Sequence, residues 1–256
     1  MMKILVTGVK GQLGYDVCRE LKERGYTNYK GIDIEDLDIT DEIAVNKYIE
    51  NFKPDVVIHN AAWTAVDKAE EYKDKVYAVN ALGPKYIAEA CKKINATMMF
   101  ISTDYVFPGN GENYYKEDDH KGALGIYGKT KSDGEDFVKS ILDKYFIIRI
   151  SWVFGINGNN YVKTMLRLAE TKNELNIVCD QIGSPTYTYD LSKLMCDMIE
   201  TNKFGVYHAT NEGICSWYEF TKYIFEVAGI TNVKVNPITT KEYQSMVKQA
   251  YRPLNS

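Results

Sequence analysis

The sequence has no apolar run of the roughly 18 residues that a membrane-spanning helix needs, and it has no secretory signal. It also has no basic patch, and its net charge is −4. Binding to nucleic acid or to an anionic membrane is therefore not expected. The cysteines number five and none belongs to a Cys-x-x-Cys pair, which indicates small core residues in a reducing compartment. We expect a soluble, cytoplasmic protein.

What the sequence does contain is a regular alternation of strand and helix patterns over its first 150 residues. Short apolar runs, rich in β-branched residues, predict strands at 3–7, 29–34, 55–59, 97–101 and 145–150. Helical periods separate them, so we predict an α/β fold of the Rossmann type, a doubly wound parallel sheet covered by helices on both faces.

After residue 150 the alternation weakens, which predicts a smaller, interleaved α/β substrate domain. The expected boundaries are 1–150 and about 186–213 for a dinucleotide-binding domain. Residues from about 151 to 185 and from 214 to 256 are expected to form the substrate domain. With 256 residues and 45% apolar content, the chain is long enough to bury a core for both.

Glycines punctuate the first strand-to-helix turn. Gly8, Gly11 and Gly14 lie at G-x-x-G-x-x-G spacing, one residue longer in the first gap than the usual dinucleotide fingerprint. Gly8 would allow a tight turn, Gly11 would let the backbone approach a pyrophosphate, and Gly14 would let the helix pack closely on the strand. The position of the motif between a strand and a helix predicts a dinucleotide site.

Asp33, at the end of the second predicted strand, follows Gly14 by about 20 residues, where an acid that binds ribose is expected. The alternative is an ordinary acidic loop residue. Further acids precede the next basic residue, Lys47: Glu35, Asp36, Asp38 and Asp41. Because this edge would repel a 2′-phosphate, the sequence predicts a preference for NADH over NADPH.

Tyr127 and Lys131 lie four residues apart in a predicted helix, so their side chains share one face. A nearby cation lowers the pKa of a phenol, which would make Tyr127 a proton donor for carbonyl reduction. Two ordinary surface residues are the alternative. Thr103 and Asp104 follow the fourth strand, at the sheet edge where doubly wound folds bind ligands, and could contact a substrate oxygen and sugar hydroxyls.

Four other residues each allow two interpretations. His59 follows an apolar strand and is expected to be a core histidine rather than a catalyst. Asn80 is either a residue that hydrogen-bonds its helix to a loop or a surface amide. Trp152 contacts either the substrate or a hinge between domains, whereas Trp217 is expected to pack. The polar segment 108–124 is expected to form a flexible rim over the site.

In combination, these residues resemble the extended short-chain dehydrogenase/reductases, and within them the dTDP-4-dehydrorhamnose reductase family. The resemblance covers nearly the whole chain and rests on a set of motifs at residues 7–14, 64–70, 102–107, 127/131, 151–153, 163–169, 180–186 and 252–256. It implies reduction by NADH or NADPH of the 4-keto group of dTDP-4-dehydro-L-rhamnose, giving dTDP-L-rhamnose.

The resemblance also implies roles for individual residues. Tyr127 would donate the proton, Lys131 would hold the ribose and tune Tyr127, and Thr103 would complete the catalytic set. The sugar nucleotide would be contacted by Thr103, Asp104 and Trp152. Cofactor contacts would come from Gly11, Gln12, Leu13, Asp33, Asp38, Ile39, Ala62, Trp63, Thr64, Ile101, Tyr127 and Lys131.

Two features depart from the family pattern. Trp63 stands where relatives usually carry His or Tyr, and the chain ends at Ser256, where relatives continue into a further strand and helix. A homodimer and a Mg²⁺ site, for which Asp16 and Asp190 would be ligands, therefore stay open, and no metal ligand is assigned. Reduction of another 4-keto-6-deoxy sugar nucleotide is one alternative function. Another is a non-catalytic nucleotide-binding regulatory subunit, similar to the β subunit of methionine adenosyltransferase.

Overall fold

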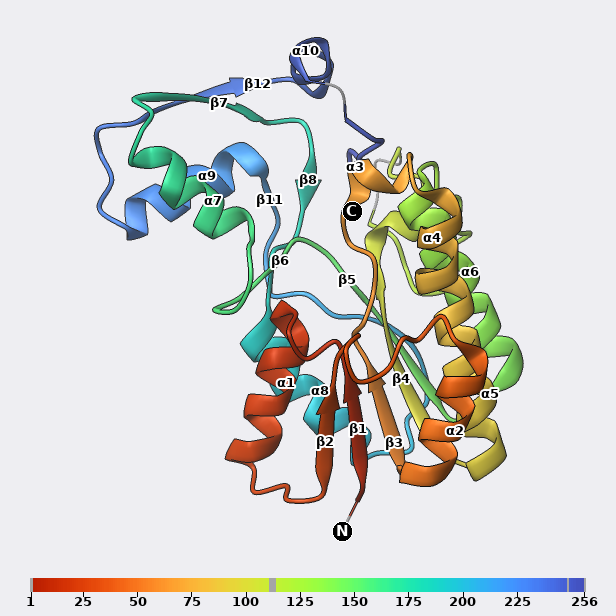
Figure 1. Cartoon of the computed structure of the whole chain (residues 1–256). Helices are drawn as coiled ribbons and strands as arrows, with labels where there is room; N and C mark the ends of the chain where they lie inside the picture. Colours follow the sequence, from red (N-terminus) through yellow and green to blue (C-terminus); the bar gives the residue numbers. More distant parts are fainter. Residues whose placement is uncertain (1, 111–113, 248, 256) are drawn as a thin grey trace.

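A six-stranded, fully parallel sheet forms the centre of the computed structural model, which describes residues 2–110, 114–247 and 249–255. Figure 1 shows its strands running side by side, and their order is β10-β5-β4-β3-β1-β2. The strands are β1 (Ile4–Thr7), β2 (Tyr29–Ile32), β3 (Val56–His59), β4 (Thr97–Thr103), β5 (Tyr145–Ile150) and β10 (Gly205–His208). The predicted doubly wound fold is confirmed.

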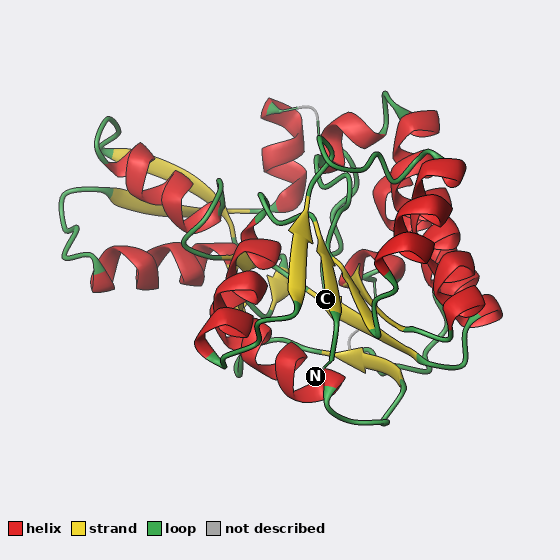
Figure 2. Ribbon diagram, turned by 60° about the horizontal axis from the view of Figure 1, so that its bottom comes forward, coloured by secondary structure: helices red, strands yellow, loops and turns green. Residues whose placement is uncertain are grey.

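Helices cover both faces of this sheet (Figure 2). On one face lie α1 (Gln12–Glu23) and α8 (Thr188–Ile199); on the other lie α2 (Glu42–Phe52), α5 (Gly83–Ile94) and α6 (Ile126–Ile141). Alternate residues of a strand point to opposite faces, so Ile4 and Val6 pack against α1 whereas Leu5 packs on the α2 and α5 side. Burial on both faces explains why the strands are almost wholly apolar.

The helical segment that precedes β4 contains an irregular turn. It consists of α4 (Lys73–Tyr77), a π-helical turn, η1 (Ala78–Leu82), and α5. Asn80 lies in the π turn and is fully buried. Since hydrophobic periodicity does not distinguish a π turn from an α-helical one, the sequence pattern alone could not reveal it.

A second, smaller lobe follows β5 and lies to the upper left in Figure 1. Its helices α7 (Tyr161–Ala169) and α9 (Trp217–Val227) pack with the parallel pair β7 (Glu174–Val178) and β12 (Lys234–Ile238) around Met165 and Phe220. Two short strand pairs lie where the chain passes between the main sheet and this lobe. They are β6 (Val153–Phe154) with β9 (Thr186–Tyr187), and β8 (Ile182–Gly183) with β11 (Cys215–Ser216). Between these excursions the chain returns to the main sheet as α8 and β10.

The carboxyl-terminal segment connects the two lobes. After α10 (Thr240–Met246), Arg252 forms an ion pair with Asp67, which belongs to the short helix α3 (Val66–Ala69). The backbone N–H groups of Leu254 and Asn255 donate to the carbonyl of Gly109, and Leu254 O accepts from Ile182 in β8. Ser256, and residues 111–113 of the predicted flexible rim, lie outside the described residues.

All five cysteines are free thiols; Cys91 and Cys196 are buried, as expected for core residues, whereas Cys18, Cys179 and Cys215 are partly exposed. In residues 2–110, 114–247 and 249–255, no helix is long and apolar enough to cross a membrane.

Candidate active site

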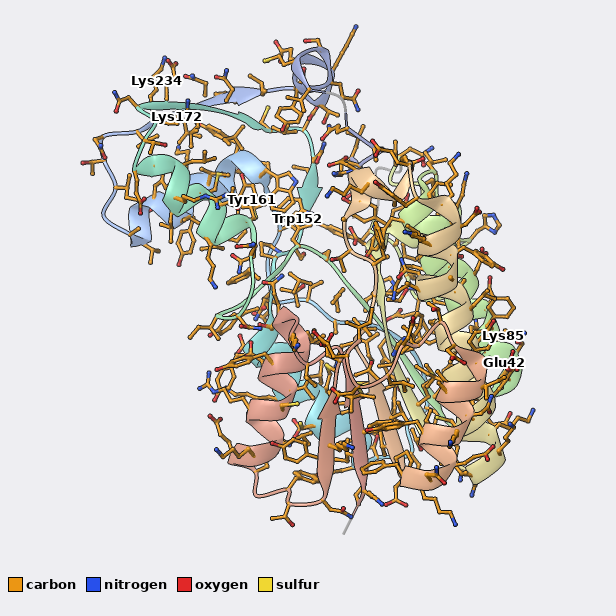
Figure 3. The ribbon with its side chains drawn as sticks, in the orientation of Figure 1. Glu42, Lys85, Trp152, Tyr161, Lys172 and Lys234 are labelled. Carbon is orange, nitrogen blue, oxygen red and sulfur yellow. The ribbon has the colours of Figure 1, made fainter. Side chains whose placement is uncertain are left out.

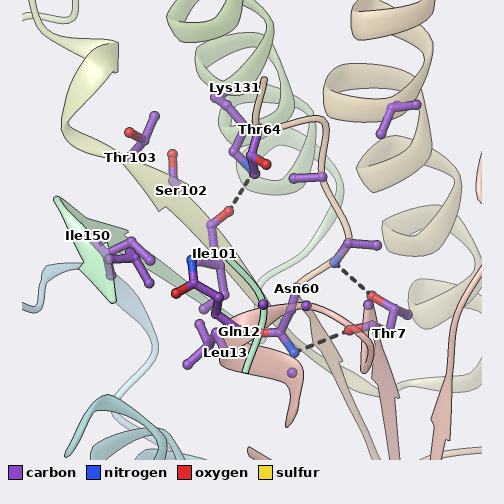
Figure 4. Close-up of a pocket in the computed structure, with 18 of the residues that line it drawn as sticks. Thr7, Gln12, Leu13, Asn60, Thr64, Ile101, Ser102, Thr103, Lys131 and Ile150 are labelled. Carbon is purple, nitrogen blue, oxygen red and sulfur yellow. Dashed lines mark hydrogen bonds between the residues drawn. The ribbon is translucent and has the colours of Figure 1, made fainter. Parts of the chain in front are cut away.

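A cavity of about 780 Å³ opens at the carboxyl ends of the strands (Figure 4). Its wall includes the last residues of β1, β2, β4 and β5, which is where a doubly wound sheet binds ligands. Of the predicted site residues, all but Trp63 line it. The residues brought together there are Gly8, Gly11, Gln12, Leu13, Gly14, Asp33, Asp38, Ile39, Ala62, Thr64, Ile101, Thr103, Asp104, Tyr127, Lys131 and Trp152.

The glycine loop forms one end of the cavity. Gly8 has a φ of +68°, and a Cβ there would lie 2.7 Å from the Ala61 nitrogen. A Cβ on Gly14 would lie 2.2 Å from the Gly8 carbonyl oxygen, so only glycine permits this close packing of α1 on the loop. The first turn of α1 therefore presents its backbone N–H groups to the cavity, an arrangement that attracts phosphate.

Asp33 lies beside the glycine loop. Its Oδ2 accepts a hydrogen bond from Lys10 N at 2.8 Å, and its Oδ1 accepts one from Ile34 N at 2.9 Å. The carboxylate is thus held at the rim of the cavity, where the sequence pattern placed a ribose-binding acid. Lys10 also lines the cavity. The run of acidic residues after position 33 gave no indication of a cation there.

Asn80 positions the loop that follows β3. Its Oδ1 accepts from Trp63 N at 2.8 Å, and its Nδ2 donates to Trp63 O at 3.1 Å. This pair of bonds confirms the interpretation of Asn80 as a helix-to-loop residue. The Trp63 indole packs against Tyr72 and donates from Nε1 to Ala65 O, so its ring does not form part of the wall, whereas Ala62 and Thr64 do.

Lys131 projects from α6 toward the end of β4 (Figure 4). It is only 2% exposed, its Nζ donates to Ile101 O at 2.6 Å, and the ammonium lies 4.1 Å from the centroid of the Phe100 ring. Burial lowers the pKa of Lys131 to about 7, against the influence of the Glu135 carboxylate, which raises it. Removal from water disfavours the charged form of a lysine.

The expected lowering of the pKa of Tyr127 is wrong. Burial raises the pKa of its phenol to about 12, because the hydroxyl loses hydration; a hydrogen bond with Thr103 lowers it and the charge of Asp104 raises it. The ammonium of Lys131 is engaged by Ile101 O instead. At neutral pH the Tyr127 hydroxyl therefore carries its proton.

Thr103 lies between Tyr127 and Asp104 in the cavity wall. The Thr103 hydroxyl donates to Asp104 Oδ1 at 2.8 Å and accepts from Tyr105 N at 3.3 Å. The ring of Tyr105 meets that of Tyr127 edge to face, with centroids 5.4 Å apart. Tyr127, Thr103 and Asp104 thus lie together on the cavity wall.

A buried ion pair lies behind this group, and the sequence pattern did not identify it. The Glu135 side chain is fully buried; it accepts from Arg149 Nε at 2.9 Å and Nη2 at 2.8 Å, and from Ser102 Oγ at 2.6 Å. Glu135 follows Lys131 by four residues on α6, and Ser102 lies between Ile101 and Thr103. That i, i+4 spacing was the signal that could have suggested a carboxylate beside the lysine.

Trp152 forms the cavity wall nearest the smaller lobe. Its ring stacks on Trp217 at a centroid distance of 3.6 Å and an interplanar angle of 10°. Tyr161, labelled near Trp152 in Figure 3, packs against Trp217 in turn. Trp217 is a packing residue, as predicted, and Trp152 belongs both to the cavity and to the contact between lobes.

His59 is a core residue, as predicted. It is 1% exposed, its Nδ1 lies 2.8 Å from Thr7 Oγ1, and its ring stacks on Phe100. Burial lowers the pKa of His59 to about 3, so the ring is neutral at physiological pH.

Asp16 and Asp190, the two residues considered for a Mg²⁺ site, each accept a hydrogen bond from a neighbouring side chain. Asp16 is fully buried and accepts a hydrogen bond from the Thr188 hydroxyl, and Asp190 accepts one from Asn211 Nδ2 at 2.9 Å. Within the described part of the chain, no group of three or more histidine, cysteine or acidic side chains could hold a metal ion.

Comparison with known proteins gives a consistent result. Residues 2–256 match the family model described as RmlD substrate binding domain. The chain is 42% identical to the dTDP-4-dehydrorhamnose reductase of Aggregatibacter actinomycetemcomitans, over all of this chain and 90% of the relative.

Two solved structures are similar to the chain over nearly its whole length. One is a dTDP-4-dehydrorhamnose reductase from Clostridium acetobutylicum, with a TM-score of 0.95 and 46% identity, covering 100% of this chain and 89% of that one. The other is the Bacillus anthracis enzyme in complex with NADP, with a TM-score of 0.94 and 41% identity, covering 99% and 89%.

The parallel sheet, the glycine loop and the Tyr127–Thr103–Lys131 group define an NAD(P)H-dependent oxidoreductase of the short-chain dehydrogenase/reductase type. Within that class, the chain belongs to the dTDP-4-dehydrorhamnose reductase family. The resemblance drawn from the sequence motifs is therefore confirmed.

Proposed function

We propose that this chain reduces the 4-keto group of dTDP-4-dehydro-L-rhamnose to give dTDP-L-rhamnose, with a nicotinamide cofactor in the cavity. The observation that carries the proposal is the grouping of Tyr127, Thr103 and Lys131 on the same cavity as the glycine loop. A dinucleotide that is bound at that loop and extends along the strand ends would reach these side chains. Two of the relatives over 40% identical bear the name of this activity.

The cavity fits a dinucleotide at the glycine loop, at Asp33 and along Ile101. When bound, a reduced nicotinamide supplies the hydride. Tyr127 supplies the proton: its raised pKa keeps the hydroxyl protonated at neutral pH, and an alkoxide is a far stronger base than a phenolate. Thr103, on the same cavity wall as this phenol, holds the substrate oxygen in line. Lys131 contributes a buried cation, held by Ile101 O, that offsets the charge that Tyr127 acquires.

The smaller lobe, from about 151 to 185 and from 214 to 255, is proposed to bind the sugar nucleotide. Trp152 supports this role because its ring forms part of the cavity wall and is backed by Trp217. Asp104 is proposed to accept hydrogen bonds from sugar hydroxyls. The remainder, up to 150 and from about 186 to 213, is proposed to bind the cofactor.

We also propose that NADH is preferred over NADPH. Asp33 and Asp38 line the cavity after β2, Glu35 and Asp36 lie between them in the chain, and the charge of these acids opposes a 2′-phosphate. Catalytic efficiencies measured with the two cofactors test this preference, and a clear advantage for NADPH would contradict it. A homodimer is a separate prediction that sedimentation analysis would test.

The activity is tested by incubating the protein with the dTDP-4-keto-L-sugar and NADH, and by identifying the sugar product by NMR. Tyr127→Phe should lower kcat by about 10²- to 10⁴-fold, because the positioned proton donor is lost. Tyr223→Phe, at an exposed tyrosine on α9, is the matched control and should leave kcat unchanged. No oxidation of NADH would favour a non-catalytic subunit, and a different epimer would favour another sugar-nucleotide reductase.

A further inference from the structure

Lys10 lies on the rim of the cofactor cavity, next to the acid that is expected to meet the ribose. It belongs to the glycine loop, and it lines the cavity together with Asp33 and Ile34. The Lys10 backbone is fixed from two sides, since its N–H donates to Asp33 Oδ2 at 2.8 Å and its carbonyl accepts from Asn157 Nδ2 at 2.8 Å. Only the side chain is left to move.

The Lys10 ammonium is held by Glu35, which lies 25 residues further along the chain. The distance from Lys10 Nζ to Glu35 Oε1 is 2.6 Å. The hydrogen bond with Glu35 raises the pKa of Lys10, and the charges of Asp33 and Asp36 act in the same direction. One cation therefore faces three carboxylates at this rim.

The three carboxylates are not equivalent. Both oxygens of Asp33 are held by backbone N–H groups, and Asp36 Oδ2 accepts from Asp33 N at 3.0 Å. The Glu35 carboxylate instead accepts from the Lys10 ammonium. The side chains of Lys10 and Glu35 are 66% and 63% exposed, so their ion pair is weak and can exchange partners.

We propose that Glu35 sets the cofactor selectivity of this chain by occupying the Lys10 ammonium, the cation best placed to receive a 2′-phosphate. This inference rests on the proposed function, because it assumes that the dinucleotide ribose lies at Asp33. A 2′-hydroxyl needs only the Asp33 carboxylate as acceptor. A 2′-phosphate, with a charge of about −1.5 to −2, needs a cation and meets carboxylates instead.

Replacing Glu35 by glutamine removes one negative charge and releases Lys10. We expect binding of adenosine 2′,5′-bisphosphate to tighten about tenfold, since a charge-assisted hydrogen bond forms where repulsion was present. Adenosine 5′-phosphate should bind Glu35→Gln as it binds the unmodified protein, within about twofold. Because the groups are exposed, the gain should shrink as salt is raised from 50 to 500 mM.

The experiment is calorimetric titration of these two nucleotides, which contain no nicotinamide and need no sugar substrate. The variants are Glu35→Gln, Lys10→Gln and the double variant, with Glu42→Gln as the matched control. Glu42 is an exposed glutamate at the start of α2 (Figure 3) and does not line the cavity.

The inference is supported if Glu35→Gln gains affinity for the 2′,5′-bisphosphate alone, if the double variant loses that gain, and if Glu42→Gln changes neither nucleotide. It is overturned if Glu35→Gln affects both nucleotides equally or neither, or if the gain persists without Lys10. If no variant binds either nucleotide, both the inference about Glu35 and the assignment of the cavity to a dinucleotide cofactor are wrong. If the reductase assay fails but Glu35→Gln still binds the 2′,5′-bisphosphate more tightly than the unmodified protein does, the proposed reaction is wrong and the inference about Glu35 stands.

Discussion

Neutralising Glu135 should be among the most damaging single changes in this protein. The carboxylate is fully buried and forms two hydrogen bonds with Arg149, whose side chain is 3% exposed. In Glu135→Gln the amide oxygen can keep one of these bonds, but the amide NH₂ group faces a guanidinium donor. Arg149 is then left as a buried cation without its counter-ion.

Breaking a buried pair from one side typically costs about 3–5 kcal/mol, and a whole domain is stable by only about 5–15 kcal/mol. We therefore expect Glu135→Gln to lose at least about a fifth of the free energy of unfolding. Asp136→Asn is the matched control: Asp136 is the next residue and contacts Lys121 at 2.6 Å, but its side chain is 60% exposed. Its loss should cost less than about 1 kcal/mol.

Urea denaturation followed by circular dichroism measures both variants under the same conditions. If Glu135→Gln lost no more stability than Asp136→Asn, the view of this pair as a structural anchor behind the active site would be wrong.

The pH dependence of kcat/KM gives a second measurement. Burial lowers the pKa of Lys131 to about 7 and Glu135 opposes that shift, so removing Glu135 lowers it further. Activity that needs the ammonium should then be lost at a lower pH.

Two further predictions concern Lys131 and the carboxyl-terminal segment. The pKa of Lys131 falls from 10.5 to about 7 on folding, so its burial costs stability in full below pH 7, and that cost disappears as the pH rises toward 10.5. Lys131→Met should be more stable than the unmodified protein below pH 7, with a gap that closes by pH 10 in denaturant titrations; a gap that did not change with pH would refute the pKa shift. Arg252→Ala should speed hydrogen exchange at Leu254 and Asn255 about tenfold, because the ion pair with Asp67 is lost, and unchanged exchange would show that the pair does not hold the segment.

Much of the fold was predictable from local pattern. The strand at Tyr145–Ile150 has the predicted bounds, and β3 begins one residue later than predicted, because strand runs are properties of neighbouring residues. Patterns that depend on tertiary packing were missed. The π turn around Asn80 and the short strands β6, β8, β9 and β11 are examples, because they form only against distant partners.

The sequence alone determined which chemical groups are available and that they lie at strand ends. Gly8, Thr103 and Tyr127 could be identified because glycine spacing and the position of a residue after a strand are local features. Only the tertiary structure decided the electrostatic state of the site. It buries Lys131 against Ile101 O, so that the lysine does not lower the pKa of Tyr127, and it brings Glu35 to Lys10 across 25 residues. Charge and pKa depend on burial and on the nearest partner in space. Neither burial nor that partner can be deduced from the local sequence.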